Sequence, residues 1–216
     1  MSVSGRRSSA SATPWLVGVV LLVAAASAVL VVWFQPPTAA VLLVVDKSGS
    51  MAGDPIRHVR ESCLAVGKAL KPEDSIGVIA FDGKPRWVVP FSRVGEAGSL
   101  RAALGRLDAE GGSALYPALA EALRVFQADP RARSARVKHV LLLSDGVTVP
   151  ADFETVVRAL AREGVTVSTV CVGVDAFDAP LLSRIASWSG GRFLFVDGAA
   201  KLPNVVVQET RRALRP

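Results

Sequence analysis

Cysteine and histidine are scarce in this sequence of 216 residues, which contains two of each. Cys63 and Cys171 lie in apolar segments, and two cysteines supply no disulfide framework. We therefore expect two buried thiols, with a disulfide between them as the alternative. His58 and His139 are far apart and have no cysteine neighbours at the spacing of zinc ligands. The sequence thus argues against a zinc domain and against a disulfide-rich scaffold.

A concentrated basic stretch of the kind that binds nucleic acid is also missing. The net charge is +6, but Arg6 and Arg7 precede a long apolar segment, and the remainder has 23 basic against 19 acidic residues. These charges are scattered over several segments, and the aromatic residues lie mostly elsewhere. We interpret the charge as solvated surface and predict no nucleic-acid partner.

Charged residues are absent from the twenty positions 15–34, WLVGVVLLVAAASAVLVVWF. At ~1.5 Å per residue, a helix of this length spans a hydrocarbon core of roughly 30 Å. Trp15, Trp33 and Phe34 stand at its ends, where interfacial aromatic residues are usual. The segment predicts a transmembrane helix, and the alternative is a signal peptide cleaved near residues 38–40.

The flanks of this apolar segment predict the organisation of the chain. Because Arg6 and Arg7 precede it, the positive-inside rule places residues 1–14 in the cytoplasm and the remainder outside. We therefore expect a single-pass protein of the cell membrane. Residues 35–39 form a short linker that two prolines stiffen, and one domain of ordinary size follows at residues 40–216.

Strand-like and helix-like segments alternate along this domain, which predicts an α/β fold with a parallel sheet covered on both faces. Pro90 supports a hairpin at a sheet edge, and Asp54 is a suitable N-cap for the first helix. We expect strands at residues 41–45, 74–81, 87–91, 138–143, 165–172 and 192–196, and helices at residues 55–70, 99–107, 117–126, 153–162, 181–189 and 205–214.

Oxygen-bearing side chains gather in three of the loops between these segments. Asp46, Ser48 and Ser50 follow the first strand, Ser113 lies in a glycine-led loop before a helix, and Asp145 follows a later buried strand. Open α/β sheets bind ligands at the carboxyl ends of their strands. Carboxylates and hydroxyls are hard oxygen donors that suit Mg²⁺. These residues predict one Mg²⁺ site, at the end of the first strand that points away from the membrane.

Three segments carry a resemblance to a known family: VLLVVDKSGSM at residues 41–51, GGSALYPAL at residues 111–119 and HVLLLSDG at residues 139–146. In this order they resemble the motifs of a von Willebrand factor type A domain with a metal-ion-dependent adhesion site, of the bacterial membrane-anchored type. The resemblance covers about residues 40–200. It implies a doubly wound, Rossmann-like α/β fold that binds a divalent cation at the top of the sheet, Mg²⁺ or else Mn²⁺ or Ca²⁺.

The resemblance also implies a role for each site residue. Asp46, Ser48 and Ser50 match the first metal-binding motif, and Asp145 matches the aspartate of the third loop. Ser113 stands where the family usually has threonine, which keeps the hydroxyl but loses the methyl group that restricts its rotamer. An Asp or Glu carboxylate from a partner protein would complete the metal's ligands. We therefore expect a protein-binding module rather than an enzyme.

Two other functions stay open. The segment DKSGS at residues 46–50 resembles the phosphorylated motif of haloacid-dehalogenase-like phosphotransferases, in which Asp46 would be the nucleophile. Against this, Thr148 and Val149 stand where a second carboxylate should follow Asp145. The remaining alternative is a membrane scaffold or assembly factor in which a metal is absent or incidental.

Overall fold

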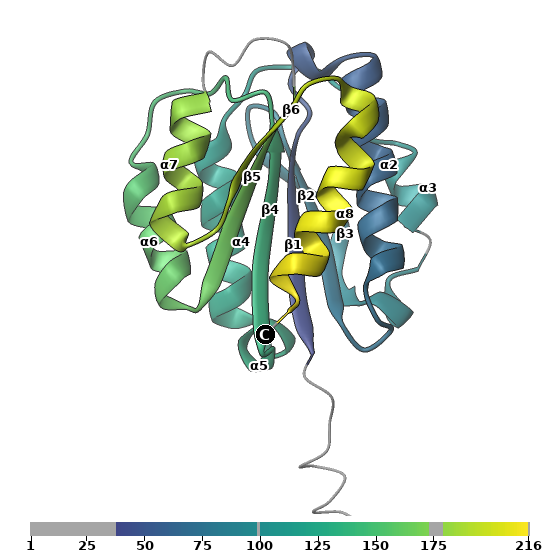
Figure 1. Cartoon of the computed structure of the whole chain (residues 1–216), viewed down its shortest axis with the longest axis vertical. Helices are drawn as coiled ribbons and strands as arrows, with labels where there is room; N and C mark the ends of the chain where they lie inside the picture. Colours follow the sequence, from purple (N-terminus) through teal and green to yellow (C-terminus); the bar gives the residue numbers. More distant parts are fainter. Residues whose placement is uncertain (1–37, 99, 173–178, 216) are drawn as a thin grey trace, which may run out of the picture. The chain divides into compact units, whose positions relative to one another are not determined.

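The sheet at the centre of the domain has six strands in the part of the chain that the computed structural model describes, residues 38–98, 100–172 and 179–215 (Figure 1). Their order is β3-β2-β1-β4-β5-β6, and all neighbours are parallel except the antiparallel pair of β2 and β3. The strands are β1 (Ala39–Asp46), β2 (Ser75–Phe81), β3 (Pro85–Arg93), β4 (Val137–Ser144), β5 (Val165–Val172) and β6 (Phe193–Val196).

Helices cover both faces of this sheet (Figure 1). One face packs against α2 (Asp54–Ala69), α3 (Leu100–Leu104) and α8 (Leu202–Ala213). The other packs against α4 (Leu115–Ala128), α5 (Pro130–Ser134), α6 (Phe153–Arg162) and α7 (Ala179–Ser189). Short 3₁₀ helices are η1 (Gly49–Met51), η2 (Val94–Glu96) and η3 (Ala199–Lys201).

The middle of the sheet is the most deeply buried part of the domain. All eight residues of β1 are buried, and successive side chains point to opposite faces. Leu42 and Val44 join the core beneath α4, whereas Leu43 and Val45 join the core beneath α2. Each fully buried side chain of this size stabilises the folded state by roughly 1.5–3 kcal/mol relative to an exposed one. This burial holds the carboxyl end of β1 in a fixed position.

The predicted α/β fold, with its mostly parallel sheet and helices on both faces, is confirmed. The bounds of α6 and β5 match the prediction, and β3 lies at the sheet edge as Pro90 indicated. Cys63 and Cys171 are buried thiols that form no disulfide, also as predicted, and burial raises the pKa of Cys63 to about 12.

Other local predictions were wrong. The N-cap of α2 is Gly53, whose φ of 81° suits glycine, and Asp54 is instead the first helical residue, where its carboxylate accepts a hydrogen bond from Arg57 at 2.8 Å. The helix predicted at residues 99–107 is shorter, because α3 ends at Leu104. The short helix α5 was not predicted; the carboxylate of Asp129 caps it.

The transmembrane helix predicted at residues 15–34 lies outside the described residues. Among the helices that the structure does describe, none is both long enough and apolar enough to cross a bilayer.

Candidate functional site

The carboxyl ends of β1 and β4 lie side by side in the middle of the sheet. From β1 the chain builds outward to β2 and β3 on one side, and it then returns to β4 on the other. The boundary between β1 and β4 is therefore the topological switch point, where open α/β sheets bind their ligands. Asp46 ends β1, and Ser144 ends β4, so the chain itself places polar side chains at this point.

The carboxylate of Asp46 is the centre of the cluster. Its residue is fully buried, and its Oδ1 accepts a hydrogen bond from the backbone N–H of Ser48 at 2.8 Å. Its Oδ2 accepts two more, from Ser144 Oγ at 2.8 Å and from Ser113 Oγ at 3.2 Å. One carboxylate thus joins loops that lie 67 and 98 residues away along the chain.

The loop after β1 supplies two further hydroxyls. Ser48 Oγ and Ser50 Oγ lie 3.0 Å apart, and the amide of Gly49 between them donates to the carbonyl of Gly111 at 3.0 Å. Gly111 has a φ of 82°, and a Cβ there would lie 3.3 Å from Cβ of Asp82, so glycine fits both the backbone and the space. This contact holds the loop of Ser48 against the loop of Ser113.

Asp145 lies at the same edge without a direct hydrogen bond to the other predicted site residues. Its Oδ1 accepts from the amide of Val147 at 3.1 Å, which turns the loop back on itself. Its charge nevertheless reaches the cluster. Burial raises the pKa of Asp46, hydrogen bonds from Ser48 and Ser144 oppose that rise, and the negative charge of Asp145 adds to it. The site therefore holds a desolvated carboxylate beside a second negative charge.

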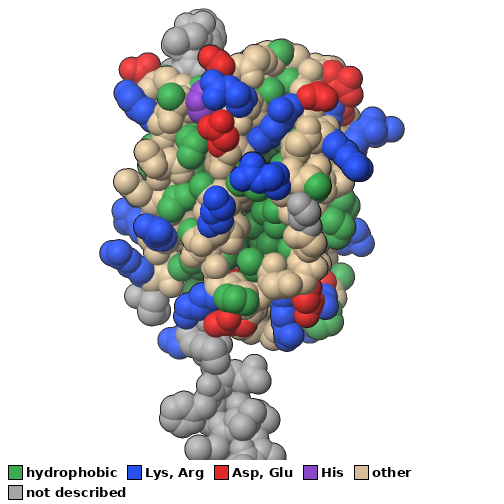
Figure 2. All heavy atoms as spheres, turned by 90° about the vertical axis from the view of Figure 1, so that its right-hand side faces the viewer, with side chains coloured by type: hydrophobic (Ala, Val, Ile, Leu, Met, Phe, Trp, Pro, Cys, Tyr) green, Lys and Arg blue, Asp and Glu red, His purple; other side chains and the backbone are tan. Residues whose placement is uncertain are grey.

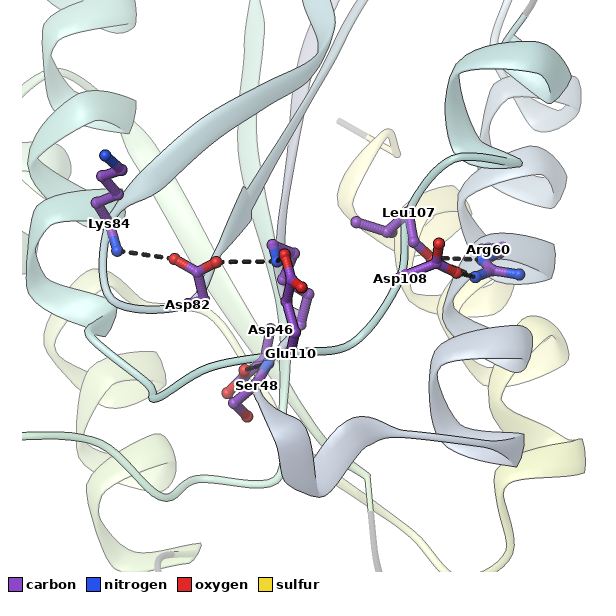
Figure 3. A network of polar contacts seen from close by, with 9 residues as sticks. Asp46, Ser48, Arg60, Asp82, Lys84, Leu107, Asp108 and Glu110 are labelled. Carbon is purple, nitrogen blue, oxygen red and sulfur yellow. Dashed lines mark hydrogen bonds and ion pairs between the residues drawn. The ribbon is translucent and has the colours of Figure 1, made fainter.

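A polar network that includes Asp82 and Glu110 lies next to this cluster (Figure 3), and the buried Lys47 links three loops within it. Lys47 Nζ lies 2.8 Å from Asp82 Oδ2 and 3.3 Å from Glu110 Oε1. Burial alone would lower the pKa of Lys47, but the hydrogen bonds to Asp82 and Glu110 raise it above its ordinary value. The hydrogen bond from Lys47 in turn lowers the pKa of Asp82. Lys47 is therefore a charged connector between β1, the β2–β3 turn and the loop that leads to Ser113.

Thr148 connects the β4 loop to the Ser113 loop. Its Oγ1 donates to the carbonyl of Ser113 at 3.3 Å and accepts from the amide of Leu115 at 3.0 Å. The amide of Val149 donates to the same Ser113 carbonyl at 3.3 Å. With Thr148 held inward, Val147 and Val149 are 56% and 55% exposed, although both are apolar. The loop thus presents an apolar edge beside the cluster.

The structure brings Asp46, Ser48, Ser50 and Ser113 together through hydrogen bonds and places Asp145 next to them. Ser113 does not cap the helix that follows it, because the N-cap of α4 is Ala114.

Sequence reasoning missed Ser144, Lys47 and Thr148. The contact of Ser144 follows from strand register: in the structure β1 and β4 are parallel and pair Val45 with Leu143, so the next residues, Asp46 and Ser144, point to the same face. No pattern in the sequence indicated this register or the contacts of Lys47 and Thr148.

The oxygen donors of the cluster fit a hard divalent cation such as Mg²⁺. Within residues 38–98, 100–172 and 179–215, no three histidine, cysteine or acidic side chains are placed to hold a metal ion. A cation at this site would therefore depend on serine hydroxyls together with the carboxylates of Asp46 and Asp145. The charge of the desolvated Asp46 carboxylate is the feature that a cation would neutralise.

A doubly wound α/β domain with polar loops at its switch point defines a class of ligand-binding domains. Within that class, the model of the von Willebrand factor type A domain matches residues 40–208. The chain belongs to this family.

Relatives of known sequence are consistent with that membership. The chain is 27% identical to Escherichia coli (strain K12) YfbK over 181 residues, which cover 79% of this chain and 30% of YfbK. It is 31% identical to mouse inter alpha-trypsin inhibitor heavy chain 4 over 159 residues, 68% of this chain and 17% of that protein. The chain spans about a third of the length of its bacterial relatives.

Solved structures show the same fold. A von Willebrand factor type A protein from Catenulispora acidiphila superposes with a TM-score of 0.74 at 25% identity, covering 83% of this chain and 43% of that one. An aerotolerance-related membrane protein from Bacteroides fragilis NCTC 9343 superposes with a TM-score of 0.65 at 17% identity, covering 81% of this chain and 99% of that one.

Proposed function

We propose that this chain is a membrane-anchored von Willebrand factor type A protein that binds a divalent cation and uses it to bind a partner protein. Asp46, Ser48, Ser50, Ser113 and Asp145 would hold the cation, which we take to be Mg²⁺, with Mn²⁺ or Ca²⁺ as substitutes. The observation that carries the proposal is the buried Asp46 carboxylate, which accepts hydroxyl hydrogen bonds from Ser113, in the loop between α3 and α4, and from Ser144, at the end of β4.

The partner would be recognised through an Asp or Glu carboxylate. When bound, the cation would offer a ligand position to an outside oxygen, because two carboxylates neutralise it at most. The serine hydroxyls supply oxygen donors without adding charge. Ser144 and the amide of Ser48 hold the Asp46 carboxylate in one orientation, and Lys47 keeps the neighbouring loops in place. These residues preorganise the loops for a ligand.

We further propose a binding role rather than catalysis. Asp46 is fully buried and its two oxygens already accept three hydrogen bonds, which favours a structural anion over a nucleophile that must approach a phosphorus atom. The apolar segment 15–34 supports a membrane anchor, with the domain outside the cell. Asp46 lies at the opposite end of β1 from Ala39.

The direct test is capture of partners from solubilised membranes on the immobilised full chain. We expect Mg²⁺-dependent capture that falls at least tenfold in EDTA and equally in Asp46→Ala, because both remove the cation. Asp197→Ala is the matched control: this aspartate is exposed and lies after β6, at the same edge of the sheet. Equal capture by wild type in Mg²⁺ and in EDTA would contradict the proposal.

The apolar edge formed by Val147 and Val149 is expected to contribute to the same interface. Burying the exposed part of two valines contributes about 1 kcal/mol each, so Val147→Ser with Val149→Ser should weaken capture by at least tenfold. Mg²⁺ binding, measured by thermal shift, should stay unchanged. Phe195→Ser is the control, since Phe195 is 44% exposed but lies on β6. Undiminished capture by the double variant would show that the edge is not part of the interface.

A further inference from the structure

A pocket of about 490 Å³ lies between β3 and the chain that follows α3. Its apolar lining residues are Ala80, Trp87, Val88, Ala103 and Leu107. These residues come from β2, from the edge strand β3, and from α3 and the chain that follows it. Polar side chains complete the lining, so the pocket combines an apolar wall with a charged rim.

The charges on the rim are not balanced. Lys47 is shared between Asp82 at 2.8 Å and Glu110 at 3.3 Å, and Asp108 is paired with Arg60 at 2.6 Å. Arg86 and Arg106 also line the pocket; both are exposed, and neither forms an ion pair with any residue in the described part of the chain.

Arginine is common on this side of the domain, so basic charge alone does not single out the pocket. Figure 2 shows lysine and arginine side chains dispersed over the side on which α2 and α3 lie. What distinguishes Arg86 and Arg106 is their position, since both line one pocket, Arg86 from β3 and Arg106 from the turn after α3. Two unpaired guanidinium groups over an apolar wall favour a carboxylate, which arginine binds in a bidentate geometry.

The pocket lies next to the proposed metal site, and Figure 3 shows Glu110, a lining residue, close to Asp46 and Ser48. Lys47 lines the pocket and follows Asp46 directly in the chain. The amide of Glu110, another lining residue, donates to the carbonyl of Lys47 at 2.7 Å. A ligand in the pocket is therefore separated from the Asp46 cluster by little more than one backbone segment.

We infer that this pocket binds a second acidic side chain of the same partner segment whose first carboxylate binds the cation. The inference rests on the proposed function and narrows it: the partner presents two acidic residues a few positions apart. An extended segment advances about 3.3 Å per residue, so one to five intervening residues cover separations of roughly 7–20 Å. Arg86 and Arg106 would then favour partner segments with two acidic residues over segments that offer only the one carboxylate for the metal.

The test uses immobilised synthetic peptides and the full chain in nonionic detergent. One peptide carries a single Asp in a Gly/Ser background, and five others add a Glu after one to five intervening residues. The chains compared are wild type, Asp46→Ala, the double variant Arg86→Gln with Arg106→Gln, and the control Arg211→Gln with Arg212→Gln. Arg211 and Arg212 are exposed on α8, away from the pocket. Thermal shift with Mg²⁺ reports separately on metal binding.

In Mg²⁺ we expect at least one doubly acidic peptide to bind wild type and the control about tenfold more tightly than the single-Asp peptide. The Arg86/Arg106 variant should lose this gain while keeping its Mg²⁺ thermal shift and its single-Asp binding.

The absence of any gain, or a gain that survives in the Arg86/Arg106 variant, would overturn the inference and leave the proposed function intact. A missing Mg²⁺ shift, with equal peptide binding by wild type and Asp46→Ala, would instead overturn the proposed function. Free glutarate serves as a competitor. If it removes the binding of all peptides to the same extent, the pocket is a site for small anions and the inference is overturned.

Discussion

Replacing Asp46 with asparagine is expected to weaken Mg²⁺ binding by about 100-fold or more, which corresponds to about 2.7 kcal/mol. The substitution keeps the size of the side chain and one oxygen that can accept from the amide of Ser48, but it removes one of the two negative charges of the cluster. The measurement is the rise in melting temperature with Mg²⁺ concentration, because a ligand that binds only the folded state stabilises it by RT ln(1 + [L]/Kd).

The same variant should be more stable than wild type in EDTA at neutral pH. Wild type buries an ionised carboxylate next to the charge of Asp145, whereas asparagine has no charge to desolvate. Metal affinity and metal-free stability should therefore change in opposite directions, a combination that general misfolding does not produce. Asp197→Asn should change neither quantity. A variant that is less stable in EDTA and keeps its Mg²⁺ response would contradict this account of the site.

The second large effect concerns His139, in the middle of β4. Its ring is buried, Nδ1 lies 2.7 Å from Thr166 Oγ1, and Nε2 is buried with no hydrogen-bond partner among the described residues. Burial lowers the pKa of His139 to about 4, and a hydrogen bond to the backbone of Thr166 only partly opposes this. A histidine in the unfolded chain takes up its proton below about pH 6.5.

Between about pH 4 and about pH 6.5 the unfolded state therefore binds more protons than the folded state. The free energy of unfolding must fall as the pH falls through this window. The contribution of His139 is fully present above about pH 6.5, and about 3 kcal/mol of it is lost by pH 4. We expect His139→Leu to remove about 2 kcal/mol of the difference in unfolding free energy between pH 8 and pH 5.

Urea unfolding at both pH values measures this difference. Thr166→Val is the matched variant, because it removes the hydrogen bond of Thr166 but keeps His139 buried, and it should preserve the pH dependence. An equal pH dependence in His139→Leu and wild type would show that another group is responsible.

Local patterns in the sequence determined most of the fold. The apolar run of β1 determined a strand buried on both faces, since a strand with no polar side can only lie inside a sheet that helices cover. The apolar face of α6 determined both ends of that helix, with Gly164 following at a φ of 76°. Pro90 determined the edge position of β3 because it cannot donate a ladder hydrogen bond. Each of these signals lies within a few residues of the structure that it determines.

The candidate site was only partly predictable, because sequence signals are local and many contacts of the site are not. The chemistry of Asp46, Ser113 and Asp145 could be read from the sequence, and so could the places of Asp46 and Asp145 at strand ends, which a parallel sheet brings to one edge. The contacts that shape the site depend on residues far apart in the chain: Ser144 binds the carboxylate of Asp46 across 98 positions, and Lys47 reaches Glu110 across 63.

The tertiary structure alone also decided that Arg86 and Arg106 face one pocket, because that pocket exists only where β3 and the chain after α3 pack together. The sequence by itself determined which side chains are available at the edge of the sheet. Strand order and register decided which of them meet, since these arise from packing over the whole domain and leave no local periodicity in the chain.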